Sequence, residues 1–215
     1  VTKSISLSLQ NLFVAMQLSK SACSTKALTT SFGWDDAQTI VQHDVQEFCR
    51  VLLDNLEEKL KNTPLDGQIA NLFRGKFRSF IRAVNVDFES SKEEYFYDLS
   101  MVVKDTPDLA SYFRKYIETE LLDGDNQYST EQYGKQDVRM GTEFVQFPKV
   151  LHLHLRRFEY DFSYDRMEKI NSRFEFPATF DLSEFLAQNA DRSKSYVYDL
   201  YGVLVHSGTT YGGHY

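Results

Sequence analysis

The stretch of residues 198–215 reads YDLYGVLVHSGTTYGGHY and carries the strongest structural signal in this chain. Residues 198–206 are dense in aromatic and β-branched side chains, which is typical of a buried strand. Turn-forming residues follow at 207–210 (SGTT), and residues 212–215 (GGHY) begin a return strand. We therefore expect a hairpin whose second strand carries His214.

Two glycines precede this histidine. Because glycine has no Cβ, Gly212 and Gly213 allow another group to approach the backbone closely. An imidazole on a sheet scaffold can transfer protons near neutral pH, so His214 is a candidate for acid–base chemistry. Taken alone, the pattern favours a histidine at the end of a strand that bonds a neighbour.

Length and charge restrict the class of protein. The 215 residues can bury a substantial core in one domain or two small ones, and the net charge of −7 argues against nucleic-acid binding. The same charge suits a partner with a basic surface or tail. No apolar run reaches the ~18 residues of a membrane span, and no signal peptide is evident. The two cysteines, Cys23 and Cys49, form no disulfide framework, which fits a reducing intracellular compartment, the nucleus or the cytoplasm.

The first third of the chain predicts helices. Residues 4–18 have an amphipathic pattern without an evident N-cap, and residues 26–33 predict a short helix. In residues 41–60 the apolar positions step by three or four and form one stripe, which predicts the clearest helix of the chain. Asp44 and Glu47 lie off this stripe near the N-terminal end, where the helix dipole stabilises carboxylates. Such charges most often mark a solvated helix face.

From Phe73 onward the pattern becomes that of a sheet. Alternating apolar residues predict a long hairpin with strands at 80–88 and 95–103, separated by the polar residues 90–94. A helix is expected next, with its cap in residues 106–108, Pro107 at its first helical position and an apolar stripe over residues 109–121. After it we expect a turn at 123–126, a strand pair around Gly134 and a strand at 150–158. The remaining elements are a polar loop at 162–172, a short strand at 174–177 and a small helix at 182–186 capped by Asp181.

Two patterns could be taken for metal sites. Residues 123–126 (DGDN) lack the DxDxDG spacing and the terminal glutamate of a calcium loop. His152 and His154 lie on one face of the predicted strand, but no third ligand is near them in the sequence, which favours a hydrogen-bonded or core-lining role. We therefore expect neither a metal nor a cofactor.

Three segments together resemble the ubiquitin-specific proteases, the papain-like cysteine peptidases that remove ubiquitin. Residues 42–48 (QHDVQEF) resemble the glutamine-aspartate box of that family, residues 151–158 (LHLHLRRF) its LxLxRF strand, and residues 205–215 its histidine box. Four further segments are similar to the herpesvirus-associated group of the family, namely 31–34 (SFGW), 49–55 (CRVLLDN), 122–126 (LDGDN) and 174–177 (FEFP).

The resemblance implies an α+β fold, that of a papain-like cysteine peptidase with thumb, fingers and palm. Residues 1–215 would form a single incomplete catalytic domain. Its helical thumb would comprise residues 1–71, and its fingers and palm, with an antiparallel sheet, residues 72–215.

The resemblance also assigns roles to residues. His214 would be the catalytic histidine, which takes the proton of the nucleophile and later returns it to the leaving lysine amine. Gly212 and Gly213 would line the narrow passage for the Gly-Gly tail of ubiquitin, because a Cβ on either wall would close it.

The resemblance gives the acidic end of the helix at 41–60 a binding role as well. Asp44, with Glu47 and Arg50, would hold the basic tail of ubiquitin ahead of the diglycine. The other residues expected to border the channel are Arg157, Phe158, His206 and Tyr215.

The chain departs from the family pattern in its nucleophile. The family cysteine lies in an N-terminal box that reads roughly GxTCYxN, and no such box occurs in this sequence. Cys23 lies in SACST without the asparagine that helps to hold the oxyanion, and Cys49 is expected to be a packing thiol. The aspartate or asparagine that orients the histidine would follow residue 215. We therefore expect a chain truncated at both ends and inactive alone, and without paired CxxC motifs we expect no structural zinc.

Three functions remain open from the sequence. The favoured one is a fragment of a deubiquitinase catalytic domain, whose parent hydrolyses isopeptide and peptide bonds at the C-terminal glycine of ubiquitin by thiol catalysis. The second is a catalytically inactive ubiquitin-binding module, which the missing nucleophile favours and the intact GGHY sequence disfavours. The third is a peptidase for a ubiquitin-like modifier that also ends in diglycine. The expected partners are ubiquitin and ubiquitinated proteins, not nucleic acid or membrane.

Overall fold

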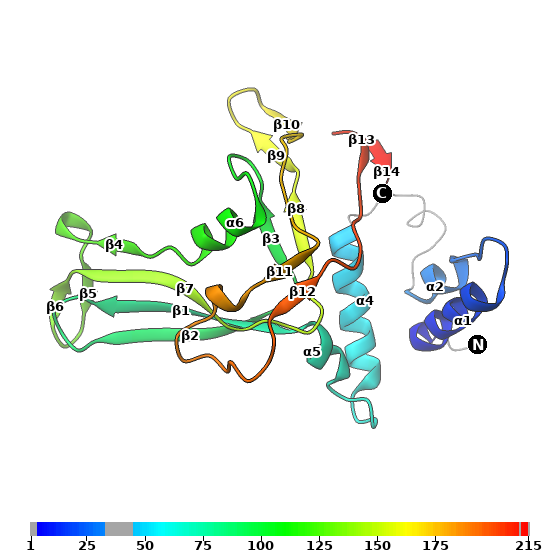
Figure 1. The fold of residues 1–215 in the computed structure, drawn as a ribbon, viewed down its shortest axis with the longest axis horizontal. Helices are drawn as coiled ribbons and strands as arrows, with labels where there is room; N and C mark the ends of the chain where they lie inside the picture. The colour runs from blue at the N-terminus through cyan, green and yellow to red at the C-terminus, as the bar shows by residue number, and fades with distance from the viewer. Residues whose placement is uncertain (1–3, 33–44, 211, 215) are drawn as a thin grey trace. The chain divides into compact units, whose positions relative to one another are not determined.

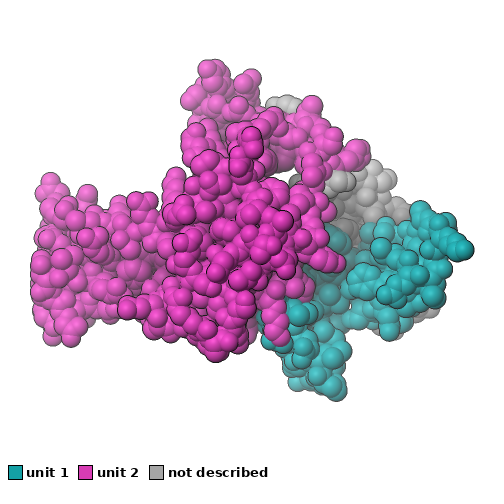
Figure 2. Space-filling model, in the orientation of Figure 1, with its two compact units in different colours: residues 1–72 teal, residues 73–215 magenta. Residues whose placement is uncertain are grey.

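The structure, a computed structural model, describes residues 4–32, 45–210 and 212–214 (Figure 1). The chain divides into two compact units, residues 1–72 and residues 73–215 (Figure 2). The described part of the first unit is helical, and the second consists mainly of strands. Each unit is described by itself, and the assignment of both to one incomplete catalytic domain stays a prediction.

Three helices of the first unit lie close to their predicted bounds over the described residues. They are α1 (Ile5–Leu18), α2 (Lys26–Ser31) and α4 (Val45–Leu60). The short helix α5 (Gln68–Phe73), where the first unit passes into the second, was not predicted. The hydroxyl of Ser4 accepts a hydrogen bond of 3.4 Å from the amide of Leu7, so α1 has the N-cap that the sequence pattern did not reveal. Residues 33–44, which include the predicted start of the long helix, lie outside the described residues.

Burial in these helices is uneven. On α4, Leu53 is buried and the predicted apolar stripe beside it is half-buried. The ring of Phe48 packs edge-on against that of Phe32, with centroids 5.6 Å apart. On α1, Ile5 is buried, whereas Phe13 on the predicted apolar face is 55% exposed.

The second unit is built on a four-stranded antiparallel sheet. Its strand order is β2-β1-β7-β4, and the strands are β1 (Gly75–Ala83), β2 (Glu89–Phe96), β4 (Glu120–Leu122) and β7 (Val138–Gln146). The predicted hairpin is present, but both of its strands lie earlier in the chain than predicted: β1 replaces the strand expected at 80–88, and β2 the strand expected at 95–103. The polar residues 90–94, expected to be a break, lie inside β2.

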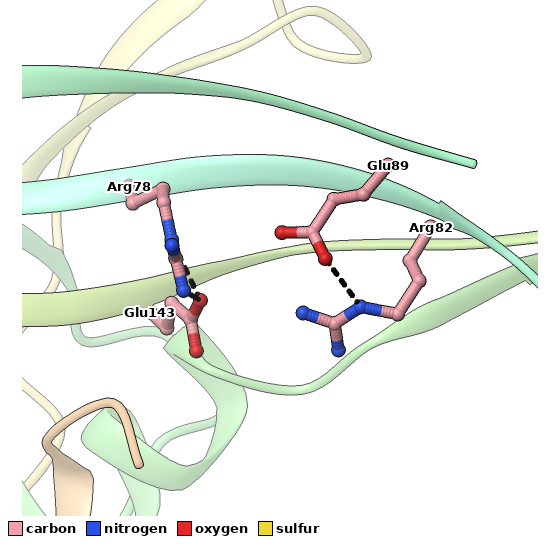
Figure 3. Close-up of polar contacts among 4 residues, drawn as sticks. All are labelled: Arg78, Arg82, Glu89 and Glu143. Atoms are coloured by element: carbon pink, nitrogen blue, oxygen red, sulfur yellow. Dashed lines mark hydrogen bonds and ion pairs between the residues drawn. The ribbon is translucent and has the colours of Figure 1, made fainter. Parts of the chain in front are cut away.

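Cross-strand ion pairs explain how so polar a sequence forms a strand. Nε of Arg78 donates to Oε1 of Glu143 at 2.8 Å, and Nη2 of Arg78 contacts the same oxygen. Nε of Arg82 donates to Oε2 of Glu89 at 2.9 Å (Figure 3). Arg78 lies opposite Glu93 on β2 as well, so charged residues of β1 face acidic residues on its neighbours. β2 is therefore stabilised by its pairing with β1 rather than by the β-propensity of its own residues.

After β2 the chain changes sheets. β3 (Leu99–Val102) pairs in parallel with β8 (Leu153–Arg156), so the predicted strand at 95–103 divides between β2 and β3. The predicted strand at 150–158 likewise begins only at Leu153, and Phe158 already belongs to the next strand.

The helix after β3 is shorter than predicted. α6 (Leu109–Tyr116) is capped by Asp108, whose Oδ1 accepts a hydrogen bond of 2.7 Å from the amide of Ser111. Pro107 therefore precedes the cap, and its predicted place at the first helical position is wrong. Leu121, predicted to continue the helix stripe, belongs to β4.

The other elements connect this framework. They are the 3₁₀ helices η1 (Gly124–Asn126) and η2 (Ser183–Phe185) and the strands β5 (Tyr128–Thr130), β6 (Gly134–Gln136), β9 (Phe158–Asp161), β10 (Arg166–Lys169), β11 (Thr179–Asp181) and β12 (Val197–Asp199). The predicted turn at 123–126 and the strand pair around Gly134 are confirmed. The small helix expected at 182–186 is reduced to η2 with Leu182 as its N-cap, and Oδ1 of Asp181 accepts a hydrogen bond of 2.8 Å from the amide of Ser183. The predicted strand at 174–177 is reduced to an isolated bridge between Asp108 and Glu175.

An aromatic core holds this unit together. The rings of Phe113 on α6 and Phe144 on β7 are fully buried, with centroids 5.7 Å apart. Phe147 packs 4.5 Å from Phe144, measured between ring centroids, and Phe185 packs 5.2 Å from Phe113. The core therefore joins the large sheet to α6 and to the segment around η2.

The prediction of a buried strand over residues 198–206 is wrong. β12 ends at Asp199, and no described strand pairs with residues 200–206. The side chain of Tyr201 is fully exposed and that of Leu204 is 69% exposed. Composition indicated a strand-forming segment, but burial also requires a neighbouring strand, and the described part of the chain supplies none.

Candidate active site

A hairpin at the histidine is present, with its second strand as predicted, but residues 207–209, which were expected to be part of the turn, form its first strand. Strand β13 (Ser207–Thr209) pairs antiparallel with β14 (Gly212–His214), with Ser207 opposite His214 and Gly208 opposite Gly213. Gly208 has a φ of +135°, in the region that favours glycine. His214 is exposed on β14, which leaves its imidazole accessible for proton transfer.

The two glycines before His214 differ in their surroundings. A Cβ on Gly213 would overlap the imidazole of His206 and the carbonyl oxygen of Ser207. Among the described residues, a Cβ on Gly212 would meet nothing within 4 Å. Packing within the hairpin therefore requires glycine at position 213, whereas position 212 has open space beside it.

A second hairpin, β9–β10, holds this one. In Figure 1 it is the yellow hairpin beside the red C-terminal strands. The ring of Phe158 packs edge-on against the imidazole of His206, with centroids 5.2 Å apart. The ammonium of Lys169 donates to the carbonyl oxygens of Gly208 at 2.8 Å and His206 at 3.3 Å. The structure thus brings together Phe158, His206 and Gly213, and the role of these residues in a substrate channel stays a prediction.

Lys169 was not among the predicted site residues. It falls in residues 162–172, which the sequence predicted to be a polar loop, whereas residues 166–169 form β10. Its hydrogen bonds to the histidine hairpin connect residues 37 and 39 positions apart. No local pattern in the sequence carries that signal.

Arg157 has a structural role beside this site. Its guanidinium donates to the carbonyl oxygens of Ser172 at 2.6 Å and of Ile170 at 3.2 Å. These bonds fix the chain that leaves β10. The channel-lining role expected for Arg157 stays a prediction, and its guanidinium already has backbone partners.

The residues predicted to bind the basic tail of ubiquitin belong to the other unit. Glu47 and Arg50 are exposed on α4. Asp44 lies outside the described residues, and so does Tyr215 at the far end of the chain. The tail-binding role of Asp44, Glu47 and Arg50 and the place of Tyr215 beside the channel stay predictions.

Cys23, Cys49 and His152 lie outside the histidine hairpin. Cys23 and Cys49 are half-buried and form no disulfide with each other, and Sγ of Cys23 lies 3.7 Å from the carbonyl oxygen of Ser21. The ring of His152 stacks on Phe73 with centroids 5.1 Å apart. Burial lowers the pKa of His152, and the charge of Asp98 partly opposes this.

The described residues form neither a metal-binding cluster nor a membrane-spanning helix. They contain no group of three or more His, Cys, Asp or Glu side chains placed to hold a metal ion. Among the helices there, none combines the length and the apolar character needed to cross a bilayer.

Comparison with known families identifies the class of protein that this fold and site define. The model of the ubiquitin carboxyl-terminal hydrolase family matches residues 2–215, and the chain belongs to that family. The predicted α+β fold of a papain-like cysteine peptidase is thereby confirmed.

Similar proteins occur in fungi, plants and animals. Ubiquitin carboxyl-terminal hydrolase 15 of Saccharomyces cerevisiae is 48% identical over 222 residues, which cover 99% of this chain and 18% of that protein. Ubiquitin C-terminal hydrolase 12 of Arabidopsis thaliana is 49% identical over 218 residues, covering 100% of this chain and 20% of that protein. Ubiquitin carboxyl-terminal hydrolase 7 of Drosophila melanogaster is 46% identical over 214 residues, covering 100% and 19%. The chain thus spans about a fifth of the length of these relatives.

Proposed function

We propose that this chain is part of the catalytic domain of a deubiquitinase. The whole enzyme would hydrolyse isopeptide and peptide bonds at the C-terminal glycine of ubiquitin by thiol catalysis. The family and the names of the similar proteins support this function. The observation that carries it in this chain is the hairpin that presents His214 at its surface beside Gly212 and Gly213.

In this proposal His214 is the general base and then the general acid. Its imidazole takes the proton of a cysteine thiol, and the thiolate attacks the carbonyl carbon of the last glycine of ubiquitin. The imidazolium then returns the proton to the leaving lysine amine. Its exposure on β14 leaves the imidazole accessible to both groups.

The nucleophile is proposed to come from outside these residues. Cys23 lies on a loop and Cys49 on the flank of α4, and neither matches the cysteine box of the resemblance. A histidine without a thiol to activate and a carboxylate to orient it has little catalytic power. We therefore expect the 215 residues alone to be inactive.

The substrate passage is proposed to run beside Gly212, where a Cβ would meet no other atom and a tail without side chains has room. Phe158 and His206 border the same hairpin. Asp44, Glu47 and Arg50 would bind the basic residues that precede the diglycine, and the net charge of −7 is complementary to such a tail.

Two finer assignments belong to the same proposal. The segments quoted above for the herpesvirus-associated group support a place in that group. The two cysteines, which form no disulfide with each other, support a nuclear or cytoplasmic location.

The test is carried out with the full-length natural protein that contains these residues. Its turnover of a fluorogenic substrate at the C-terminus of ubiquitin is measured for the wild type and for His214→Gln. We expect the variant to lose at least about 10³-fold in kcat, because the proton acceptor is gone. Binding of ubiquitin, measured by fluorescence anisotropy, should stay within about threefold, because the histidine acts on the transition state.

Other outcomes identify the alternatives. A folded full-length protein that binds ubiquitin without turnover would be the inactive binding module. Faster turnover of a ubiquitin-like modifier than of ubiquitin would assign the third function. Full activity of His214→Gln would contradict the role given to His214.

A further inference from the structure

Among the described contacts of the histidine hairpin, those of one lysine and one aromatic ring come from the β9–β10 hairpin. β13 and β14 have three residues each, and they form a two-stranded sheet with no third described strand. Isolated two-stranded hairpins are marginally stable in water. Three glycines, Gly208, Gly212 and Gly213, lie in these strands and contribute no side-chain packing. The position of His214 therefore depends on contacts from outside the hairpin.

Lys169 supplies those contacts at the point that matters most for His214. Its ammonium binds the carbonyl oxygens of His206 and Gly208, which flank Ser207 on both sides. Ser207 is the residue directly opposite His214 in the register. One cation thus fixes the short piece of strand against which His214 is paired.

The chemistry of this contact suits an anchor. Hydrogen bonds from an ammonium to a carbonyl are charge-assisted and stronger than those between neutral groups. Carbonyls of alternate strand residues point to the same edge, and an edge without a neighbouring strand needs another donor. Lys169 lies at the end of β10, and its ammonium is 6.0 Å from the ring centroid of Phe158, which packs on His206. The β9–β10 hairpin thus replaces a neighbouring strand.

We propose that Lys169 is a positioning residue for His214, which it holds through the backbone of residues 206–208. The inference rests on the proposed function, because the position of His214 matters for catalysis only if His214 transfers the proton. Lys169 acts through the hairpin and not by contact with the substrate. A displacement of about 1 Å in a catalytic group can lower the rate by roughly 100-fold, so loss of the anchor has a large kinetic effect.

The experiment compares three variants of the full-length natural protein. Lys169→Met removes the charge and the donors at similar length, Lys169→Arg keeps both, and the exposed Lys149→Met is the matched control. In Lys169→Met we expect kcat to fall by about 10- to 100-fold and KM to stay within about twofold. Lys169→Arg should restore kcat to within about fivefold of the wild type, and Lys149→Met should match the wild type.

A second measurement does not depend on activity. Amide hydrogen exchange of residues 206–214 should become faster in Lys169→Met and stay unchanged in Lys149→Met, because the hairpin opens more often without its anchor. If the wild type lacks turnover but this exchange result holds, the proposed function fails and the anchoring role stands. Unchanged exchange, an unchanged kcat in Lys169→Met, or a raised KM with normal kcat would each overturn the inference. The last result would make Lys169 a substrate-binding residue.

Discussion

The four-stranded sheet and the C-terminal segment of residues 197–214 belong to one compact unit, yet they are held together in different ways. β1 is paired with β2 on one side and β7 on the other. Its Arg78 forms an ion pair with Glu143, and its Phe77 packs against the aromatic core. The C-terminal segment has strands of three residues, a run of exposed apolar side chains and, at its hairpin, hydrogen bonds from the ammonium of Lys169. The candidate catalytic residue lies in the weakly held region. Stability and chemistry therefore depend on different contacts and can be changed separately.

The largest expected effect is in the aromatic core. Phe113→Ala should lower the free energy of unfolding by about 3–5 kcal/mol, because it opens a cavity among fully buried rings. Phe162→Ala removes the same kind of ring at a site that is 88% exposed, and it should change the free energy of unfolding by less than about 0.5 kcal/mol. Denaturant unfolding of both variants checks the contrast. Equal losses would show that burial does not separate the two regions.

The next effect is in the sheet. Arg78→Met should lower the free energy of unfolding by about 1.5–3 kcal/mol, because it leaves the largely buried carboxylate of Glu143 without its donor. Lys92→Met breaks the exposed pair with Glu94 on β2 and should cost at most about 1 kcal/mol. Unfolding curves measured at low and moderate salt test the pair. A loss in Arg78→Met no larger than in Lys92→Met would contradict a special role for the Arg78–Glu143 contact.

The third prediction concerns the hairpin itself. Gly213→Ala places a methyl group against His206 and should cost about 1–2 kcal/mol of stability together with activity. Gly212→Ala meets no neighbour and should change the free energy of unfolding by less than about 0.5 kcal/mol. If the proposed passage runs beside it, Gly212→Ala should still reduce turnover. Melting temperature and kcat/KM, measured on both variants, separate the two reasons for glycine.

The smallest expected effect is a pH dependence outside both regions. Burial lowers the pKa of His152 in the folded protein, so the unfolded chain binds the proton more readily. The stability contributed by the neutral ring is therefore present above the ordinary pKa of 6.5 and is lost as the pH falls below it. His152→Phe, which keeps a ring to stack on Phe73, should flatten the dependence of stability on pH between about 7 and 5. Asp98→Asn should steepen this pH dependence, because the charge of Asp98 opposes the lowering of the His152 pKa. An unchanged slope in both variants would refute the role given to His152.

Features set by short-range chemistry were predictable from the sequence. The turn at 123–126, the strand pair around Gly134 and the hairpin around GGHY depend on residues close together in the chain, and all three are present. The motifs also led to the correct family, because their order along the chain is specific.

Features that depend on distant partners were not predictable. The charged strand β2 needs the basic residues of β1, and its sequence alone suggested a break. The apolar residues 200–206 were expected to be buried, yet no described strand covers them. Lys169 could not be assigned to the site, because its carbonyl partners are 37 and 39 residues away. In each case the local sequence does not show which distant segment lies next to these residues in the fold.

The exposed run from Leu200 to Val205 (LYGVLV) has a practical consequence. It contains no charge and no proline, and its residues belong to no helix or strand. Uncovered segments of this kind act as templates for pairing between chains and lead to aggregation. In a sample of the 215 residues alone, the mean particle size measured by light scattering should increase with protein concentration. A lysine in place of Leu204, which is 69% exposed, is the first change that should keep such a sample monodisperse.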